Sequence, residues 1–72
     1  MSDINELLEG LADRLAGIAA DLDEAGFEQL RAAADGGDPA HLAAERRLQK
    51  ARRAVSRAVA ALRTPDDGAS PL

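Results

Sequence analysis

Apolar residues recur at alternating intervals of four and three positions in two separate parts of the chain, and this limits the possible fold more than any other feature. Such spacing is typical of an α-helix that packs along one face against another helix. The first stripe is Ile4, Leu8, Leu11, Leu15, Ile18, Leu22 and Ala25, and the second is Ala44, Leu48, Ala51, Val55, Ala58 and Leu62. The two stripes predict an all-α fold with helices over about residues 3–34 and 39–63.

A short run of helix-breaking residues separates the two stripes. The Asp-Gly-Gly sequence at 35–37 cannot continue a helix cheaply. Asp38 followed by Pro39 is typical of an N-cap and a first helical position. A turn over 35–38 makes the two helices antiparallel neighbours, so the chain is predicted to form a coiled-coil-like helical hairpin.

Local signals define the hairpin domain as residues 1–64. Asp3, with Glu6 three residues later, is predicted to cap the first helix. Gly26 interrupts the first stripe, and we expect a kink or a break near this residue. Pro65 stops the second helix. The remaining residues, 65–72, hold Gly, Ser, Pro and acids and are predicted to be a disordered tail.

The stripes can be aligned so that the numbers of facing residues sum to 73. This register places Ile18 opposite Val55 in a buried layer and Leu22 opposite the smaller Ala51. Large residues therefore mostly face small or medium ones, as efficient core packing requires.

The hairpin is expected to need a partner. A chain of 72 residues rarely buries a core large enough to fold alone. A further stripe of small apolar residues flanks the first ones, and a helix with two apolar stripes favours packing against more helices. We therefore expect a homo-oligomer, most simply a dimer that forms a four-helix bundle. The residues predicted for self-association are Leu7, Ala12, Ala19 and Val59.

Charge is distributed unevenly along this small acidic protein. The net charge is −4, yet residues 1–34 carry eight acids and two bases, and residues 38–63 carry seven bases and two acids. Some of these bases form one basic stripe on the face of the second helix opposite its apolar residues. This basic stripe is Arg46, Lys50, Arg53 and Arg57. At its flanks, Arg47 and Arg52 are predicted to meet acids such as Glu28 and Asp21.

The basic stripe is open to three interpretations. It could dock an acidic protein surface, bind a nucleic-acid backbone, or be a solvated helix face without a partner. Nucleic acid is less expected, because the chain has a pI of about 4.7 and only one aromatic residue, Phe27, on which a base could stack.

Residue patterns of catalysis are not found. The chain has no cysteine and one histidine, His41, with Glu45 one turn further on and Glu28 within possible reach. A metal site built on these three residues is an alternative, but the Glu-x-x-His pairs of di-iron bundles are absent. Gly36-Gly37 is not followed by the Gly-Lys-Ser/Thr of a phosphate-binding loop. We expect no enzyme activity, no bound metal and no cofactor.

The sequence thus predicts a protein–protein interaction module that acts as an adaptor, accessory subunit or regulator. A small nucleic-acid-binding protein and a metal or cofactor carrier are the alternatives. Residues 1–10 carry three acids and no base, unlike a signal peptide, and no apolar run is long enough to span a membrane. A cytoplasmic location without membrane contact is therefore expected.

Overall fold

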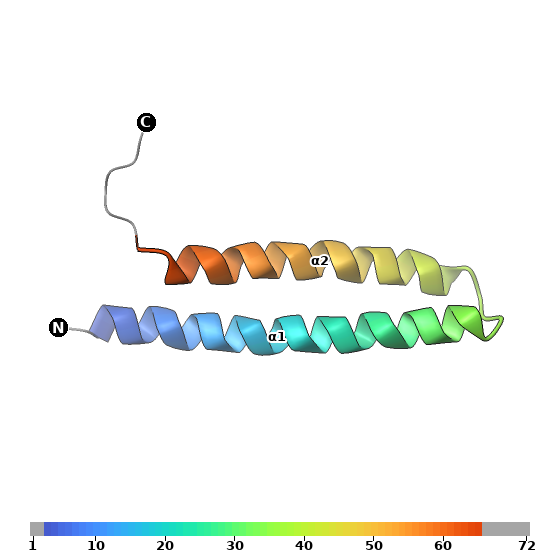
Figure 1. The fold of residues 1–72 in the computed structure, drawn as a ribbon, viewed down its shortest axis with the longest axis horizontal. Helices are drawn as coiled ribbons and strands as arrows, with labels where there is room; N and C mark the ends of the chain where they lie inside the picture. Colours follow the sequence, from blue (N-terminus) through green and yellow to red (C-terminus); the bar gives the residue numbers. More distant parts are fainter. Residues whose placement is uncertain (1–2, 66–72) are drawn as a thin grey trace, which may run out of the picture.

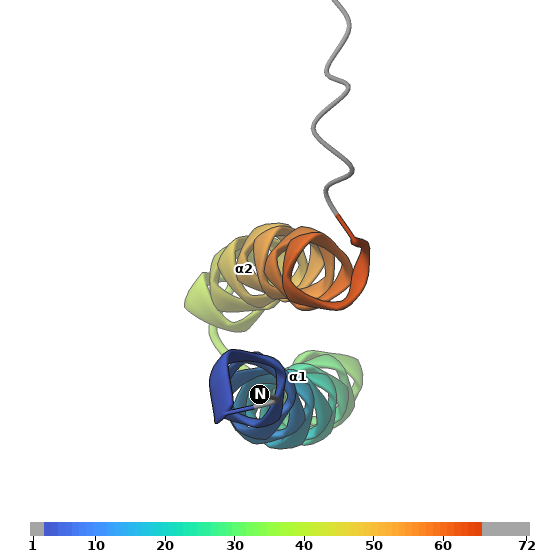
Figure 2. The same cartoon turned by 90° about the vertical axis from the view of Figure 1, so that its left-hand side faces the viewer.

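The computed structural model describes residues 3–65, which form two long α-helices joined by a short turn. Helix α1 spans Asp3–Ala34 and helix α2 spans Ala40–Arg63. The helices lie antiparallel and side by side, with the start of α1 and the end of α2 at the same end of the hairpin (Figure 1, Figure 2). No strand occurs in residues 3–65, so the predicted all-α hairpin is confirmed.

Helix α1 continues through Gly26, so the break expected at this residue does not occur. A glycine inside a helix costs about 1 kcal/mol relative to alanine. This cost is smaller than the loss of the several backbone hydrogen bonds and tertiary contacts that a break would disrupt. Gly26 lies between two contacts of α1 with α2, Asp23 with Arg52 and Gln29 with His41, which a break would disrupt.

Two glycines are required in the turn, for different reasons. The N–H of Gly37 donates to the carbonyl of Ala32 at 3.0 Å and that of Gly36 to the carbonyl of Ala33 at 3.2 Å, which is a Schellman motif. Gly36 has a φ of 84°, in the left-handed region that favours glycine. A Cβ atom at Gly37 would lie only 2.6 Å from the Ala32 carbonyl oxygen and 2.8 Å from Cδ2 of His41.

Asp38 caps the start of the second helix, as its position in the sequence predicts. Its Oδ1 accepts a hydrogen bond from the N–H of Ala40 at 2.9 Å. Helix α2 begins at Ala40, one residue after the predicted start. At the other end, the N–H and Oγ1 of Thr64 both donate to the carbonyl of Ala60, at 2.9 and 2.7 Å. Thr64 itself is extended, and α2 ends there.

The two helices meet on faces that are rotated about the helix axes from the predicted ones. The contact region, which we call the seam, contains the buried or half-buried residues Leu8, Ala12, Leu15, Ala19, Leu22 and Gly26 of α1 and His41, Glu45, Leu48, Arg52, Val55, Val59 and Leu62 of α2. Ile18, which the predicted register buries opposite Val55, is instead 47% exposed. The predicted Ile18–Val55 layer is therefore not formed.

Small side chains and ion pairs account for the rotation. Ala12 and Ala19 lie seven positions apart, and their small size lets α2 approach closely. The lengthwise register is close to the prediction. Hydrogen-bonded residues of the two helices have numbers that sum to values between 70, for Gln29 with His41, and 76, for Asp13 with Arg63.

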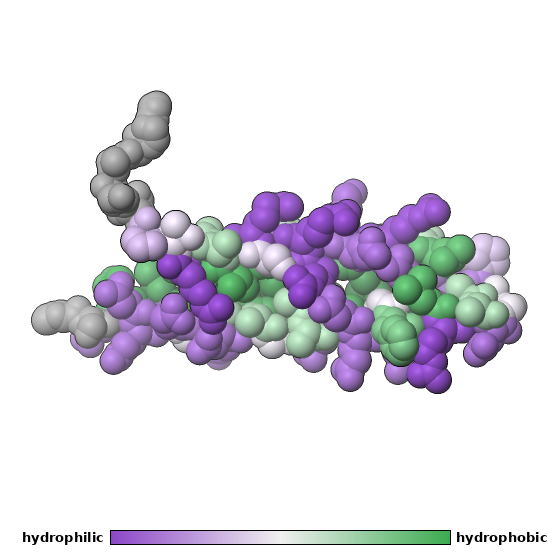
Figure 3. Space-filling model, viewed as in Figure 1, coloured by the Kyte–Doolittle hydropathy of each residue, from purple (hydrophilic) through white to green (hydrophobic). Residues whose placement is uncertain are grey.

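The seam is only partly covered. No large side chain within residues 3–65 is completely buried. Figure 3 shows one face of the hairpin, where hydrophobic side chains remain visible between the helices toward both ends and hydrophilic side chains cover the middle. Neither α1 nor α2 contains a stretch long and apolar enough to cross a membrane. The prediction of a disordered tail concerns residues that lie, apart from Pro65, outside the described part of the chain.

Candidate functional site

The seam separates two sides of the hairpin, and ion pairs line one of them. Arg63 of α2 contacts Glu9 of α1 at 3.5 Å and Asp13 at 2.6 Å. Arg52 extends from the seam to Asp23 at 2.9 Å and also donates to Ser56. We call this the ion-pair side. It comprises Glu9, Ala16, Asp23 and Leu30 of α1 and Leu42, Gln49, Ser56 and Arg63 of α2.

The Asp23–Arg52 pair is the most regular polar contact between the helices. Its hydrogen bonds hold the pKa of the Asp23 carboxyl below its ordinary value and raise the pKa of Arg52, while partial desolvation acts in the opposite direction on each group. Both side chains remain accessible to water, and exposed pairs contribute little to stability. The pair therefore contributes little to the stability of the hairpin. The sequence had predicted Asp21 as an acid near Arg52.

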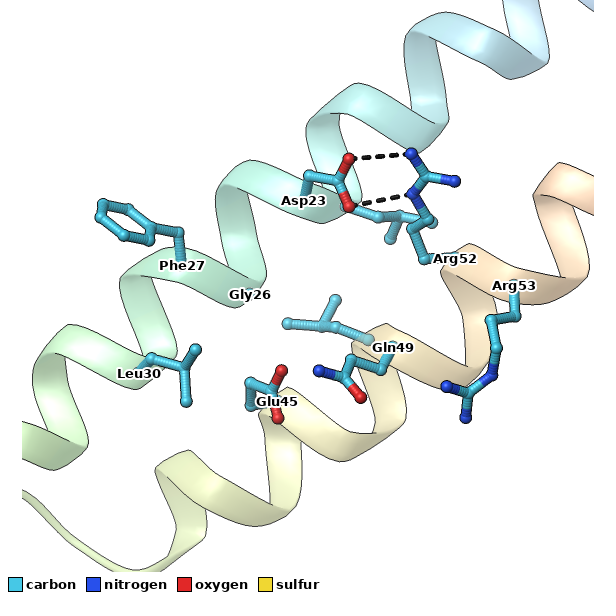
Figure 4. A pocket seen from close by; sticks show the side chains of 10 residues that line it. Asp23, Gly26, Phe27, Leu30, Glu45, Gln49, Arg52 and Arg53 are labelled. Carbon is cyan, nitrogen blue, oxygen red and sulfur yellow. Dashed lines mark hydrogen bonds and ion pairs between the residues drawn. The ribbon is translucent and has the colours of Figure 1, made fainter.

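A hollow of about 300 Å³ opens on the ion-pair side next to Gly26. A Cβ atom at Gly26 would meet nothing within 4 Å, which shows that the space beside this residue is open. Glu45 is only 8% exposed, and its carboxylate and Leu30 point into the gap between the helices (Figure 4). Phe27 projects away from α2 at the rim, with the Arg31 guanidinium 5.9 Å from its ring centroid. Arg53 also lines the rim, so the hollow has charges of both signs.

The opposite side of the hairpin is formed mainly by apolar residues next to the seam. Leu11, Ile18 and Ala25 each come one position before a small residue of the seam. They repeat every seven positions, so they share one face of α1, on the flank of the seam away from Asp23. We call it the apolar side. It comprises Ile4, Leu11, Ile18 and Ala25 of α1 and Ala44, Ala51 and Ala58 of α2. Gln29, Ala44, Arg47, Leu48 and Ala51 line a shallow depression there, which shows that both helices contribute to it.

The apolar side is built from residues that the sequence analysis assigned to the buried contact between the helices. Each predicted stripe is divided in the structure. Leu8, Leu15 and Leu22 lie in the seam, whereas Leu11 and Ile18 lie beside it and are exposed. The apolar pattern of α1 is two rows wide, one row with Leu8, Leu15 and Leu22 and one with Leu11 and Ile18. A single neighbouring helix cannot cover both rows, so this width in the sequence indicates a second apolar surface.

The four residues predicted for self-association do not lie together on the surface. Ala12 and Ala19 are buried between α1 and α2, so they are occupied within one chain. Val59 is half-buried in the seam. Leu7 is exposed, one turn from both Ile4 and Leu11, and extends the apolar side at the start of α1.

The basic stripe lies on the outer face of α2. Arg46, Lys50, Arg53 and Arg57 are all exposed, and none forms an ion pair with another residue in the range 3–65. The structure thus presents the four predicted partner-binding residues on one surface. Arg47, at the border of the apolar side, also forms no ion pair within this range.

His41 is held by a neighbouring amide. Its Nδ1 lies 2.8 Å from Oε1 of Gln29, within hydrogen-bonding distance. The alternative metal site requires His41, Glu45 and Glu28 to converge, but no group of three such residues converges anywhere in residues 3–65. Glu45 points into the hollow at Gly26 instead.

Comparison with known proteins identifies no relative. No protein-family model, no curated protein and no solved structure matches the chain. The functional interpretation therefore depends on two features of the hairpin, the apolar side and the basic stripe.

Proposed function

We propose that this chain is a non-enzymatic protein–protein interaction module that works as a homo-oligomeric helical bundle. The observation that supports this proposal is the apolar side, where large aliphatic side chains remain exposed although the hairpin is short of buried apolar surface. Ile4 is 64%, Leu7 58%, Leu11 36% and Ile18 47% exposed. Contiguous exposed apolar patches of this kind are typical of interaction sites.

Burial of the apolar side would add substantially to the stability of the chain. The exposed fractions of these four side chains together equal about two fully exposed aliphatic residues, and their burial would contribute roughly 3–6 kcal/mol per chain. Native domains are stable by only about 5–15 kcal/mol, so this is a large part of the stability of so small a domain. A dimer that stacks two hairpins through their apolar sides would be a four-helix bundle.

The basic stripe supports a second contact, to an acidic surface of another protein. It lies on the outer face of α2, away from the apolar side, so an oligomer formed through the apolar side would leave it accessible. In this arrangement the protein acts as an adaptor, accessory subunit or regulator. Nucleic acid remains the alternative ligand of this stripe, and the acidic net charge of −4 disfavours it.

Sedimentation equilibrium at micromolar concentration tests the assembly. The wild-type protein should have at least twice the chain mass of 7.5 kDa, and its melting temperature should rise with concentration. Ile18→Asp places a charge on the apolar side and should shift the protein to monomer. A concentration-independent melting temperature of a folded monomeric wild type would contradict the proposal.

Leu30→Asp is the matched control. Leu30 lies on the same helix with 45% exposure, close to that of Ile18, but on the ion-pair side. The charge change and the loss of apolar surface are therefore nearly the same in both variants. Leu30→Asp should remain oligomeric, and equal dissociation of the two variants would show that the apolar side is not the interface.

A further inference from the structure

We infer that the apolar side is covered by a second copy of this chain, in which α1 of each copy lies along α2 of the other. This inference rests on the proposed function, because it specifies how the two hairpins of that homo-oligomer are arranged. Two hairpins can stack through the same side about a two-fold axis in two ways. An axis parallel to the helices places α1 beside the partner's α2, whereas an axis perpendicular to them places α1 beside the partner's α1.

Helix direction does not distinguish the two arrangements, since neighbouring helices are antiparallel in both. The charges of the helices do distinguish them. Helix α1 carries eight acids and two bases, a net charge of −6, and α2 carries seven bases and one acid, a net charge of +6. Packed helices have axes about 8–10 Å apart, which is close to the screening length of about 8 Å at physiological salt. The charges that border the apolar side itself are Arg14, Asp21 and Glu28 on α1, a net charge of −1, and Arg47 on α2, a charge of +1. Pairing α1 with the partner's α2 therefore opposes unlike charges, and pairing α1 with α1 opposes like charges.

The sizes of the side chains favour the same arrangement. On the apolar side, α1 contributes the large residues Ile4, Leu11 and Ile18, whereas α2 contributes only alanines at 44, 51 and 58. With α1 against the partner's α2 in the lengthwise register of the hairpin, Ile18 lies level with Ala58, so a large side chain faces a small one on each of the two contacts. With α1 against α1, the large residues would face one another on one contact and the alanines would face one another on the other, which leaves a cavity between the alanines.

One intermolecular ion pair follows from this geometry. Glu28 borders the apolar side on α1, because it lies three residues after Ala25. Arg47 borders it on α2, because it lies three residues after Ala44 and four before Ala51. Neither forms an ion pair within residues 3–65. A two-fold axis parallel to the helices leaves the position of every residue along the helix direction unchanged. The lengthwise register within one hairpin therefore also applies between the two copies. Their numbers sum to 75, within the observed range of 70 to 76. Glu28 should therefore meet Arg47 of the partner subunit, twice in each dimer.

Mixing two charge-reversal variants tests this arrangement. In Glu28→Arg each homodimer opposes arginines at both sites, and in Arg47→Glu each opposes glutamates. Both homodimers should be roughly tenfold weaker than wild type, by the usual strength of exposed ion pairs. In the mixture, each heterodimer again has two pairs of opposite charge, so the heterodimer should form at near wild-type affinity. Circular dichroism should show the same helix content for all the chains in the mixture.

The outcomes separate this inference from the proposed function. Preferential heterodimer formation, measured by native mass spectrometry of the mixture, supports the α1-to-α2 arrangement, because an ion pair within one chain could not be restored by mixing. Variants that dimerise as tightly as wild type, with no preference for the heterodimer, would overturn the arrangement and leave the homo-oligomer intact. A wild type that stays monomeric would overturn both.

Discussion

Arg52 binds Asp23 through two parallel hydrogen bonds, from Nε to Oδ1 at 2.9 Å and from Nη2 to Oδ2 at 3.0 Å (Figure 4). The contact connects the two helices across 29 positions of sequence. It is bidentate, a geometry in which the guanidinium and carboxylate planes must be aligned. The backbone of Arg52 lies in the seam, and its guanidinium lies on the ion-pair side. The pair therefore forms only when α1 turns Asp23, and not Asp21, toward α2.

Replacement of Asp23 by Asn should lower the stability of the hairpin in a pH-dependent manner. The pKa of Asp23 is lower in the folded protein than its ordinary value of 3.8, because Arg52 hydrogen-bonds the carboxylate. Its contribution to folding is therefore fully present above this value and is lost as the pH falls through the lower folded pKa. The melting temperatures of wild type and Asp23→Asn should differ at pH 7 and converge in acid.

Asp21→Asn is the control for this experiment. Asp21 is exposed two residues away and makes no ion pair within residues 3–65. This change should leave the melting temperature nearly unaltered at pH 7. A larger effect at Asp21 than at Asp23 would indicate that Arg52 has the partner predicted from the sequence.

Gly26→Ala should stabilise the protein by about 1 kcal/mol, the difference in helix propensity between the two residues. A Cβ atom at this position meets no neighbour within 4 Å, so the new methyl group enters open space. Urea denaturation at fixed protein concentration measures the change. Gly17→Ala at an exposed position of the same helix gives the propensity effect alone. Any additional gain at Gly26 would report apolar contacts inside the hollow, and destabilisation would show that the hollow is too small for a methyl group.

Ala19→Leu should destabilise the hairpin by roughly 1–3 kcal/mol, the usual cost of inserting a larger side chain into a packed contact. Ala19 is buried where α1 and α2 approach each other. Ala20→Leu, at the exposed neighbouring position, should cost little. Thermal denaturation of the two variants thus tests the rotation of α1. Equal effects would mean that Ala19 is not in the seam.

Reversal of Arg53 and Arg57 to Glu tests the basic stripe. Both side chains are exposed, so the helical circular-dichroism signal should be unchanged. Capture of an acidic protein partner should be lost. Wild-type protein should show negligible binding to duplex DNA at physiological salt, because the chain has a net charge of −4 and a single aromatic residue.

The salt dependence identifies the alternative. If all four residues of the stripe contacted phosphates, log affinity for duplex DNA would fall with log salt concentration at a slope near −3 to −4, by the rule of about −0.9 per phosphate. Such a slope, abolished by the double reversal, would assign the stripe to nucleic acid. Retained partner capture after the reversal would leave the stripe as a solvated face and assign the interaction to the apolar side.

The number of helices, their approximate ends and their antiparallel order follow from the amino-acid sequence alone. Each of these depends on interactions between residues close in the chain. Asp38 caps its own helix through the N–H of Ala40, and Gly36 adopts a φ of 84° that favours glycine. The heptad spacing also identified apolar residues that lie in the seam, such as Leu15 and Leu48, and it indicated the lengthwise register to within one helical turn.

Which of two adjacent apolar rows faces the other helix does not follow from the sequence and is seen only in the packed hairpin. Periodicity places Leu15 and Leu22 next to two rows, one containing Ala12 and Ala19 and the other containing Leu11 and Ile18, and it treats both as apolar. The choice depends on contacts between residues far apart in the chain, such as those joining Asp23 to Arg52 and Asp13 to Arg63. The small side chains of the first row let the two backbones approach closely, whereas the larger ones of the second do not. The continuity of α1 through Gly26 also depends on residues far apart in the chain, because the contacts with α2 on both sides of this residue, at Asp23 and at Gln29, outweigh the local preference of glycine.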